Sequence, residues 1–148
     1  MRIALAADHA GYKLKDELAA WLRDLGYDVA DLGTNGPESV DYPEYGAKLA
    51  RSVATGAADF GIAVCGSGIG ISIAVNREPH CRCARVDEPI SATLAREHND
   101  ANVIAFGARL IGSDMAKACV SAFLGTEFAG GRHQRRVDQL SQELQESD

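Results

Sequence analysis

The sequence predicts an α/β protein built as a three-layer sandwich around a five-stranded parallel sheet, with the flavodoxin-like strand order 2-1-3-4-5. Two observations predict it. Short apolar runs alternate with helical patterns five times along the 148 residues, and parallel strands need crossover connections of the kind that helices supply. Several runs are also continuously apolar, as is typical of strands buried on both faces. We expect a single domain over residues 1–148.

The elements follow from apolar spacing and turn signals. The predicted strands are residues 3–7, 27–32, 60–65, 81–86 and 102–106. In the first helix Leu14, Leu18 and Leu22 recur at helical spacing, and Gly26 ends it. The remaining helices are predicted at residues 44–55, 71–76, 89–98, 113–124 and 133–146. The last comes after the sheet is complete, so its apolar stripe needs a surface to cover, and a second subunit could provide one.

Composition and charge exclude several classes of protein. Apolar residues make up 46% of the chain, and 15 Lys and Arg against 21 Asp and Glu give a net charge of -6. We therefore expect no nucleic acid and no membrane as partner, and the absence of a signal-peptide pattern favours a cytoplasmic protein. The four cysteines predict no disulfide framework. Cys81 and Cys83 fit one face of a half-buried strand, and Cys119 fits the core.

The predicted topology brings reactive residues to one place. Ligands of open parallel sheets bind beyond the carboxyl ends of the strands, where the strand order reverses, which here lies between the first and third strands. Asp8 and His9 follow the first strand. Cys65 ends the third strand and opens the glycine-rich loop Gly66, Ser67, Gly68, Ile69 and Gly70. Backbone amides of such a loop, with a helix start behind them, can hold a phosphate or a developing oxyanion.

Each of these features also has a plain structural interpretation. The loop matches neither the dinucleotide-binding pattern nor the P-loop, and its glycines could form only a tight turn. Cys65 could end a buried strand rather than act as a base or nucleophile. Asp8 could cap the following helix, leaving His9 as a surface imidazole.

Basic residues elsewhere suit a phosphate. Arg132 and Arg136 lie one helical turn apart, although they could simply be a solvated helix start. Arg109 follows the fifth strand on the ligand side of the sheet. His98 precedes that strand, so it lies at the opposite end of the sheet. Its structural interpretation is a cation near a helix C-terminus, without a role in catalysis. If His98 is catalytic, it has to reach the cleft of a second subunit.

Six segments, in order along nearly the whole chain, resemble ribose-5-phosphate isomerase type B. They are DHAG at 8–11, DYP at 41–43, CGSGIGIS at 65–72, REHNDAN at 96–102, FGAR at 106–109 and RHQRR at 132–136. The wider family includes isomerases of galactose 6-phosphate, allose 6-phosphate and tetrose phosphates. The resemblance implies interconversion of an aldose and a ketose phosphate through a cis-enediolate in carbohydrate metabolism, without metal or cofactor. It also implies a homodimer, or a dimer of dimers, with active sites shared across the interface.

The resemblance also implies roles for individual residues. Cys65 would move the proton between C2 and C1. In a second branch of the family, a glutamate in the helix after the loop is the base, but Ile71 and Ser72 stand there in this chain. Ser67 replaces a threonine common in the family and keeps the hydroxyl near the enediolate, alongside the amides of residues 66–70. Asp8 and His98 would serve ring opening and hydroxyl contacts.

The remaining implied site residues line the sugar pocket or bind the phosphate. Tyr42 and Asn99 would line the pocket, and the phosphate would be held by His9, Arg109, Arg132 and Arg136. Sequence leaves three alternatives open. The substrate could be another aldose phosphate, the chain could be a phosphosugar- or nucleotide-binding module without catalysis, or it could carry a flavin. No aromatic residues flank the glycine loop to stack a flavin ring, and a binding module would not need Cys65.

Overall fold

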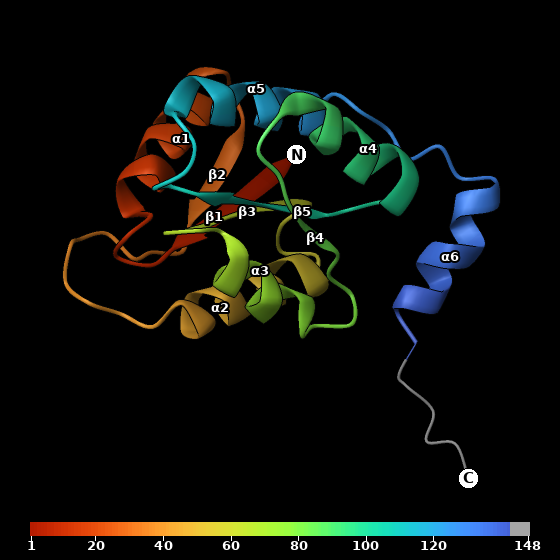
Figure 1. Cartoon of the computed structure of the whole chain (residues 1–148), viewed down its shortest axis with the longest axis horizontal. Coiled ribbons are helices and arrows are strands. Elements are labelled where there is room, and N and C mark those ends of the chain that lie inside the picture. The colour runs from red at the N-terminus through yellow and green to blue at the C-terminus, as the bar shows by residue number, and fades with distance from the viewer. Residues whose placement is uncertain (143–148) are drawn as a thin grey trace, which may run out of the picture.

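The computed structural model describes residues 1–142, which form one parallel sheet flanked by helices (Figure 1). The strands are β1 (Arg2–Ala7), β2 (Asp28–Asp31), β3 (Phe60–Cys65), β4 (Cys83–Arg85) and β5 (Val103–Gly107). The helices are α1 (Tyr12–Asp24), α2 (Tyr42–Ala54), α3 (Ile69–Asn76), α4 (Pro89–Asn99), α5 (Ser113–Leu124) and α6 (Arg132–Leu140). The predicted fold class is confirmed. The predicted single domain extends over residues 143–148, which lie outside the described part.

The sheet separates two hydrophobic cores. Helices α1, α4 and α5 cover one face, and α2 and α3 cover the other (Figure 1). Leu5, Ile62 and Ile104 point into the first core, whereas Ala6 and Ala63 point into the second. This alternation along neighbouring strands is the two-residue period of a pleated strand, and burial on both faces explains the continuous apolar runs.

The strand order is β2-β1-β3-β5-β4, so the predicted order was wrong at one edge. Strand β5 is buried throughout and lies between β3 and β4, whereas all three residues of β4 are only half-buried. An edge position suits β4 because this strand is short and carries an arginine, whose burial in the middle of the sheet would cost more free energy than at the edge. As a result, β3 and β5 are paired neighbours, and Cys65 lies opposite Gly107.

Several element boundaries differ from the prediction. Helix α2 begins at Tyr42, two residues before the predicted start, because Pro43 is compatible with the first turn of a helix. Strand β4 lacks Cys81 and Arg82, since the Arg82 amide donates to the Asn102 side chain instead of to a neighbouring strand. Helix α6 ends at Leu140 rather than at residue 146.

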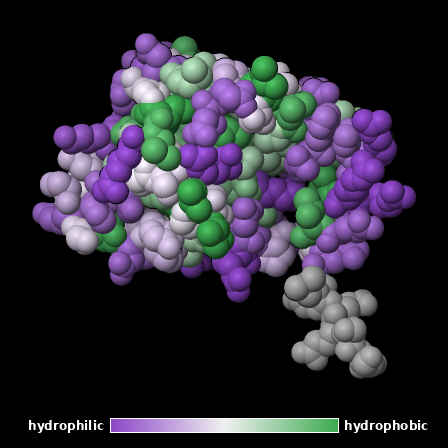
Figure 2. Space-filling view, in the orientation of Figure 1, coloured by the Kyte–Doolittle hydropathy of each residue, from purple (hydrophilic) through white to green (hydrophobic). Residues whose placement is uncertain are grey.

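Helix α6 stands apart from the sheet, beyond β4 and beside α4 (Figure 1). Its Val137 is buried, but Leu140 is 61% exposed and lines a groove of about 430 Å³ together with Cys81 and Cys83. Figure 2 shows hydrophobic surface between this helix and the body of the protein. The chain thus covers only part of the apolar stripe, and Leu144 lies outside the described residues. Within residues 1–142, no helix is long and apolar enough to span a membrane.

Candidate active site

The turn after β1 places Asp8 and His9 at the carboxyl end of the sheet. The Asp8 side chain is buried, and its Oδ1 accepts hydrogen bonds from the amides of Ala10 at 3.0 Å and Gly11 at 3.1 Å. Asp8 therefore holds the turn, and Gly11, not Asp8, is the N-cap of α1. His9 Nδ1 lies 3.2 Å from the amide nitrogen of Val40, which joins this turn to the loop before α2.

The glycine loop turns its backbone toward the sulfur of Cys65. Cys65 is the last residue of β3 and only 4% exposed. Its Sγ accepts a hydrogen bond from the amide of Gly68 at 3.1 Å. Gly68 has φ +75°, and a Cβ there would lie 2.7 Å from the carbonyl carbon of Phe106. Only glycine fits this conformation and this close approach, so the glycine is needed to bring the amide to the thiol.

Two further side chains reach the loop from other elements. The guanidinium of Arg109 lies over Gly66, where a Cβ would be 3.1 Å from its Nη1. The ring of Tyr42, at the start of α2, lies against Gly70, where a Cβ would be 2.6 Å from Cζ. The structure thus gathers a thiol, a guanidinium and a phenol around one loop at the carboxyl end of the sheet.

The other predicted site residues form a second group. His98 and Asn99 end α4, before β5, whereas Cys65 lies opposite the last residue of β5. The five residues of β5 separate the two levels by roughly 13 Å. Within the second group, the imidazole of His98 stacks on that of His133 in α6, with centroids 4.4 Å apart and rings 13° from parallel. Helix α6 also carries Arg132 and Arg136.

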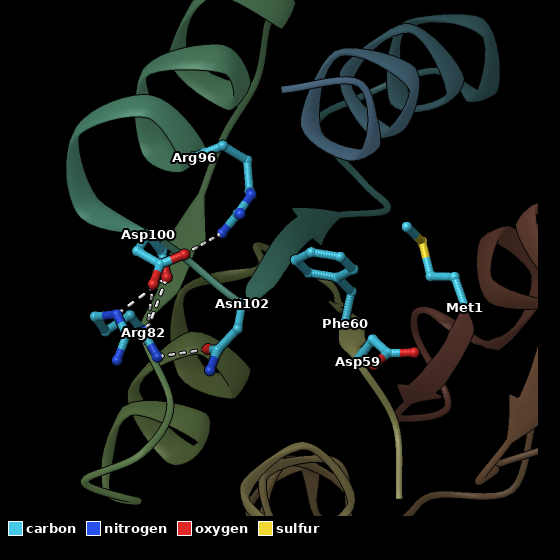
Figure 3. Close-up of a pocket in the computed structure, with 7 residues that line it drawn as sticks. All are labelled: Met1, Asp59, Phe60, Arg82, Arg96, Asp100 and Asn102. Carbon is cyan, nitrogen blue, oxygen red and sulfur yellow. Dashed lines mark hydrogen bonds and ion pairs between the residues drawn. The ribbon is translucent and has the colours of Figure 1, made fainter. Parts of the chain in front are cut away.

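A hollow of about 520 Å³ lies at the amino end of the sheet, away from Cys65 (Figure 3). Arg96 contributes to its wall, and the Nε and Nη1 of its guanidinium donate to groups within the chain. It donates at 2.7 Å both to Asp100 Oδ1 and to the carbonyl of Ala101, and it lies 4.9 Å from the centroid of the Phe60 ring. These contacts hold α4 to the sheet, so Arg96 has a structural role in the wall of this hollow.

The remaining thiols are held in the protonated form. Burial is the main cause that raises the pKa of Cys81 to about 11 and that of Cys119 to about 11, and it also raises the pKa of Cys83. Cys81 and Cys83 contribute to the same core, and Cys119 is fully buried, as predicted. Within residues 1–142, no group of three or more His, Cys, Asp or Glu side chains could hold a metal ion.

Comparisons with known proteins identify the family of this chain. The family described as Ribose/Galactose Isomerase matches residues 3–140. The chain belongs to this family. Ribose-5-phosphate isomerase B of Escherichia coli K12 is 47% identical over 140 residues, which cover 95% of this chain and 94% of that protein.

Solved structures of family members share this fold. Ribose-5-phosphate isomerase B of Clostridium thermocellum superimposes with a TM-score of 0.94 at 48% identity, covering 95% of each chain. The Mycoplasma genitalium ribose-5-phosphate isomerase B, with bound ribulose 5-phosphate, has a TM-score of 0.91 at 35% identity and covers 95% of this chain and 93% of that one. Both structures therefore share the fold of this chain over nearly its whole length.

The sequence interpretation missed two basic residues that hold the loops of the site in place. Arg85 in β4 donates through Nε to the carbonyl of Ser67 at 2.7 Å. Lys15 in α1 is fully buried and donates to Asp31 and Asn35 at the start of the loop before α2. Lys15 shares the helix face of Leu18 and Leu22, a spacing that could have indicated burial.

Proposed function

We propose that this protein interconverts D-ribose 5-phosphate and D-ribulose 5-phosphate through a cis-enediolate, with Cys65 as the base. The observation that carries the proposal is the thiol at the end of β3. Its Sγ accepts a hydrogen bond from the Gly68 amide at 3.1 Å, and the guanidinium of Arg109 lies over the same loop. An amide that donates to sulfur stabilises a negative charge there, and a binding module would need no such thiol. The names of the relatives in the family support the same substrate pair.

The proposed chemistry moves two protons. The Cys65 thiolate takes the proton from C2 of the open-chain aldose, and the electron pair moves into a C1–C2 double bond as the carbonyl oxygen O1 becomes an oxyanion. The same thiol then returns a proton to C1, while the proton on O2 moves to O1. Loop amides and the Ser67 hydroxyl would stabilise the enediolate, and losing one such donor typically costs about 10²–10³ in rate.

The second group of residues would complete the site across a subunit interface. His98 and Asn99 lie at the opposite end of the sheet from Cys65 in their own chain. We therefore propose a dimer, or a dimer of dimers, in which His98 assists ring opening with Asp8 of the other subunit. Arg132 and Arg136 would reach the phosphate together with His9 and Arg109. A phosphate held in this way orients the reacting carbons, which lowers the barrier beyond what the base supplies.

The activity is tested with purified protein, ribose 5-phosphate and EDTA, in deuterated water. We expect turnover with deuterium entering the product at C1, and turnover abolished by EDTA would contradict the proposal that no metal is required. Cys65→Ala should lower kcat by about 10²–10⁴ with little change in KM. Cys83→Ala is the matched control, because Cys83 lies in β4 outside the glycine loop, and its kcat should stay near that of the wild type.

Mixing two inactive variants tests the shared site. A hybrid dimer of Cys65→Ala and His98→Ala has one site with both residues intact and one with neither. Random exchange of equal amounts makes half of the dimers hybrids, so activity should recover to about a quarter of the wild-type value. No recovery, despite subunit exchange shown by mass spectrometry, would place His98 outside the site.

A second candidate substrate is a galactose or allose 6-phosphate, because the family description covers both ribose and galactose isomerases. Tetrose 4-phosphates are a further alternative. The loop between β2 and α2 would set the length of the sugar that fits, since it ends at Tyr42 beside Gly70. Comparing kcat/KM for four-, five- and six-carbon substrates decides between them. We further propose that the protein is cytoplasmic, acts in the pentose phosphate pathway and needs no cofactor.

A further inference from the structure

A continuous chain of hydrogen bonds runs from the edge of the sheet to the sulfur of Cys65. Arg85 is the last residue of β4, and its Nε donates to the carbonyl oxygen of Ser67 at 2.7 Å. The other end of the same peptide unit is the amide of Gly68, which donates to Sγ of Cys65 at 3.1 Å. One peptide therefore lies between a guanidinium and the thiol.

This peptide is held in place by close packing on the end of β5. A Cβ at Gly107 would lie 2.5 Å from the carbonyl carbon of Ser67, and one at Gly68 would lie 2.8 Å from the Gly107 nitrogen. In a planar trans peptide, the carbonyl and the N–H point in opposite directions. Fixing the Ser67 carbonyl on Arg85 therefore fixes the direction of the Gly68 N–H toward Cys65.

Arg85 makes two contacts through different nitrogens of its guanidinium, and its Nε is the one that donates to the glycine loop. Its Nη1 donates to Asp87 Oδ2 at 2.8 Å, but the Asp87 side chain is 54% exposed, against 25% for Arg85. Water screens the more exposed carboxylate, whereas the contact with Ser67 is part-buried. A charged donor makes a stronger hydrogen bond than a neutral one, and a hydrogen bond to a carbonyl polarises the N–H of the same peptide.

We propose that Arg85 is a positioning residue that acts on Cys65 through the Ser67–Gly68 peptide. It holds the peptide so that the Gly68 amide keeps donating to the sulfur, and its positive charge strengthens that hydrogen bond in favour of the thiolate. Its effect on catalysis rests on the proposed role of Cys65 as the base. Its effect on the thiol itself requires no substrate and holds independently of that role.

The test compares Arg85→Met with Arg51→Met, which makes the same change at an exposed position of α2. The first measurement is the rate at which iodoacetamide alkylates Cys65 at pH 7, followed by mass spectrometry of the peptide that contains it. Loss of one hydrogen bond predicts a rate roughly five- to tenfold lower in Arg85→Met. Arg51→Met should react as the wild type does.

The second measurement is steady-state isomerisation of ribose 5-phosphate. We expect Arg85→Met to lower kcat by a similar factor and to change KM by less than about twofold. Arg85→Lys keeps the charge but loses the planar Nε donor, so it should recover only part of both losses. It also serves as the readout if Arg85→Met does not fold.

Three outcomes would overturn the inference. They are unchanged alkylation in Arg85→Met, a raised KM with unchanged kcat, or full recovery by Arg85→Lys, which would mean that no directed hydrogen bond is involved. Failure of the proposed function looks different. Wild-type protein would then not isomerise ribose 5-phosphate, or Cys65→Ala would stay active, while the alkylation rate would still report on Arg85.

Discussion

Replacing Lys15 with methionine removes a cation that is buried completely. The Lys15 side chain is 0% exposed, and its Nζ donates at 2.7 Å to each carboxylate oxygen of Asp31 and to Asp16 Oδ1, and at 3.0 Å to Asn35 Oδ1. These contacts join α1 to the end of β2 and to the loop that leads to Tyr42. Methionine keeps the length of the apolar stem but makes none of these hydrogen bonds.

The loss of unfolding free energy depends on the carboxylate that Lys15→Met leaves unpaired. Asp31, whose side chain is 21% exposed, would keep only the Gly33 amide, which donates to Oδ1 at 2.9 Å. Breaking a buried ion pair on one side costs about 3–5 kcal/mol. Partial exposure of Asp31 and Asp16 to water places Lys15→Met at the lower end, about 3 kcal/mol. For a chain of 148 residues, that loss lowers Tm by about 6–12 °C.

Urea and thermal unfolding followed by circular dichroism measure this loss. Lys13→Met is the matched control on the exposed side of α1, and it should change stability by less than about 0.5 kcal/mol. Lys15→Met combined with Asp31→Asn should regain part of the loss, because the unpaired charge is gone. A cost of less than about 1 kcal/mol for Lys15→Met, or a double variant no more stable than the single one, would show that Lys15 is not the partner of a buried ion pair.

Three further predictions concern the site and the thiols. Gly70→Ala places a Cβ 2.6 Å from Cζ of Tyr42, so the exposed ring has to move; we expect KM for the sugar phosphate to rise several-fold at nearly unchanged Tm. Desolvation, together with neighbouring His98 and the guanidiniums of Arg132 and Arg136, lowers the pKa of His133, so an NMR titration should find the midpoint of this imidazole below that of an ordinary histidine. Burial raises the pKa of Cys119 to about 11, so native protein at pH 8 should show no reaction of this thiol with Ellman's reagent until denaturant is added.

The residues at the carboxyl ends of the strands were predictable because topology alone brings them together. Asp8 follows β1 and Cys65 ends β3, and any parallel sheet with these two strands adjacent places their ends side by side. His98 was predictable at the opposite end of the sheet for the same reason, since α4 has to return to the start of β5. None of these placements required knowledge of a side-chain contact.

The order of the last two strands was not predictable from their spacing along the chain. Strands β4 and β5 are consecutive in sequence, and only composition distinguishes them, because residues 81–86 include two arginines and residues 103–107 include no charged residue. Burial decided between them, because β5 is covered on both faces whereas β4 carries the half-buried Arg85. The interior position of β5 in turn brings Arg109 over the glycine loop.

The features that the sequence predicts unaided are local or periodic: the alternation of strands and helices, the glycine-rich loop after Cys65, and the arginines one turn apart at residues 132 and 136. Tertiary structure alone decided which charged side chains serve as internal supports. Arg85 looks like an ordinary surface cation in the sequence, yet it holds the Ser67 carbonyl. The position of Lys15 on the apolar face of α1 indicates burial, but nothing in the sequence indicates that its partners are Asp31 and Asn35. The physical reason is that a side chain's charge partner is fixed by packing between elements far apart in the chain, and hydrophobic periodicity carries no information about those partners.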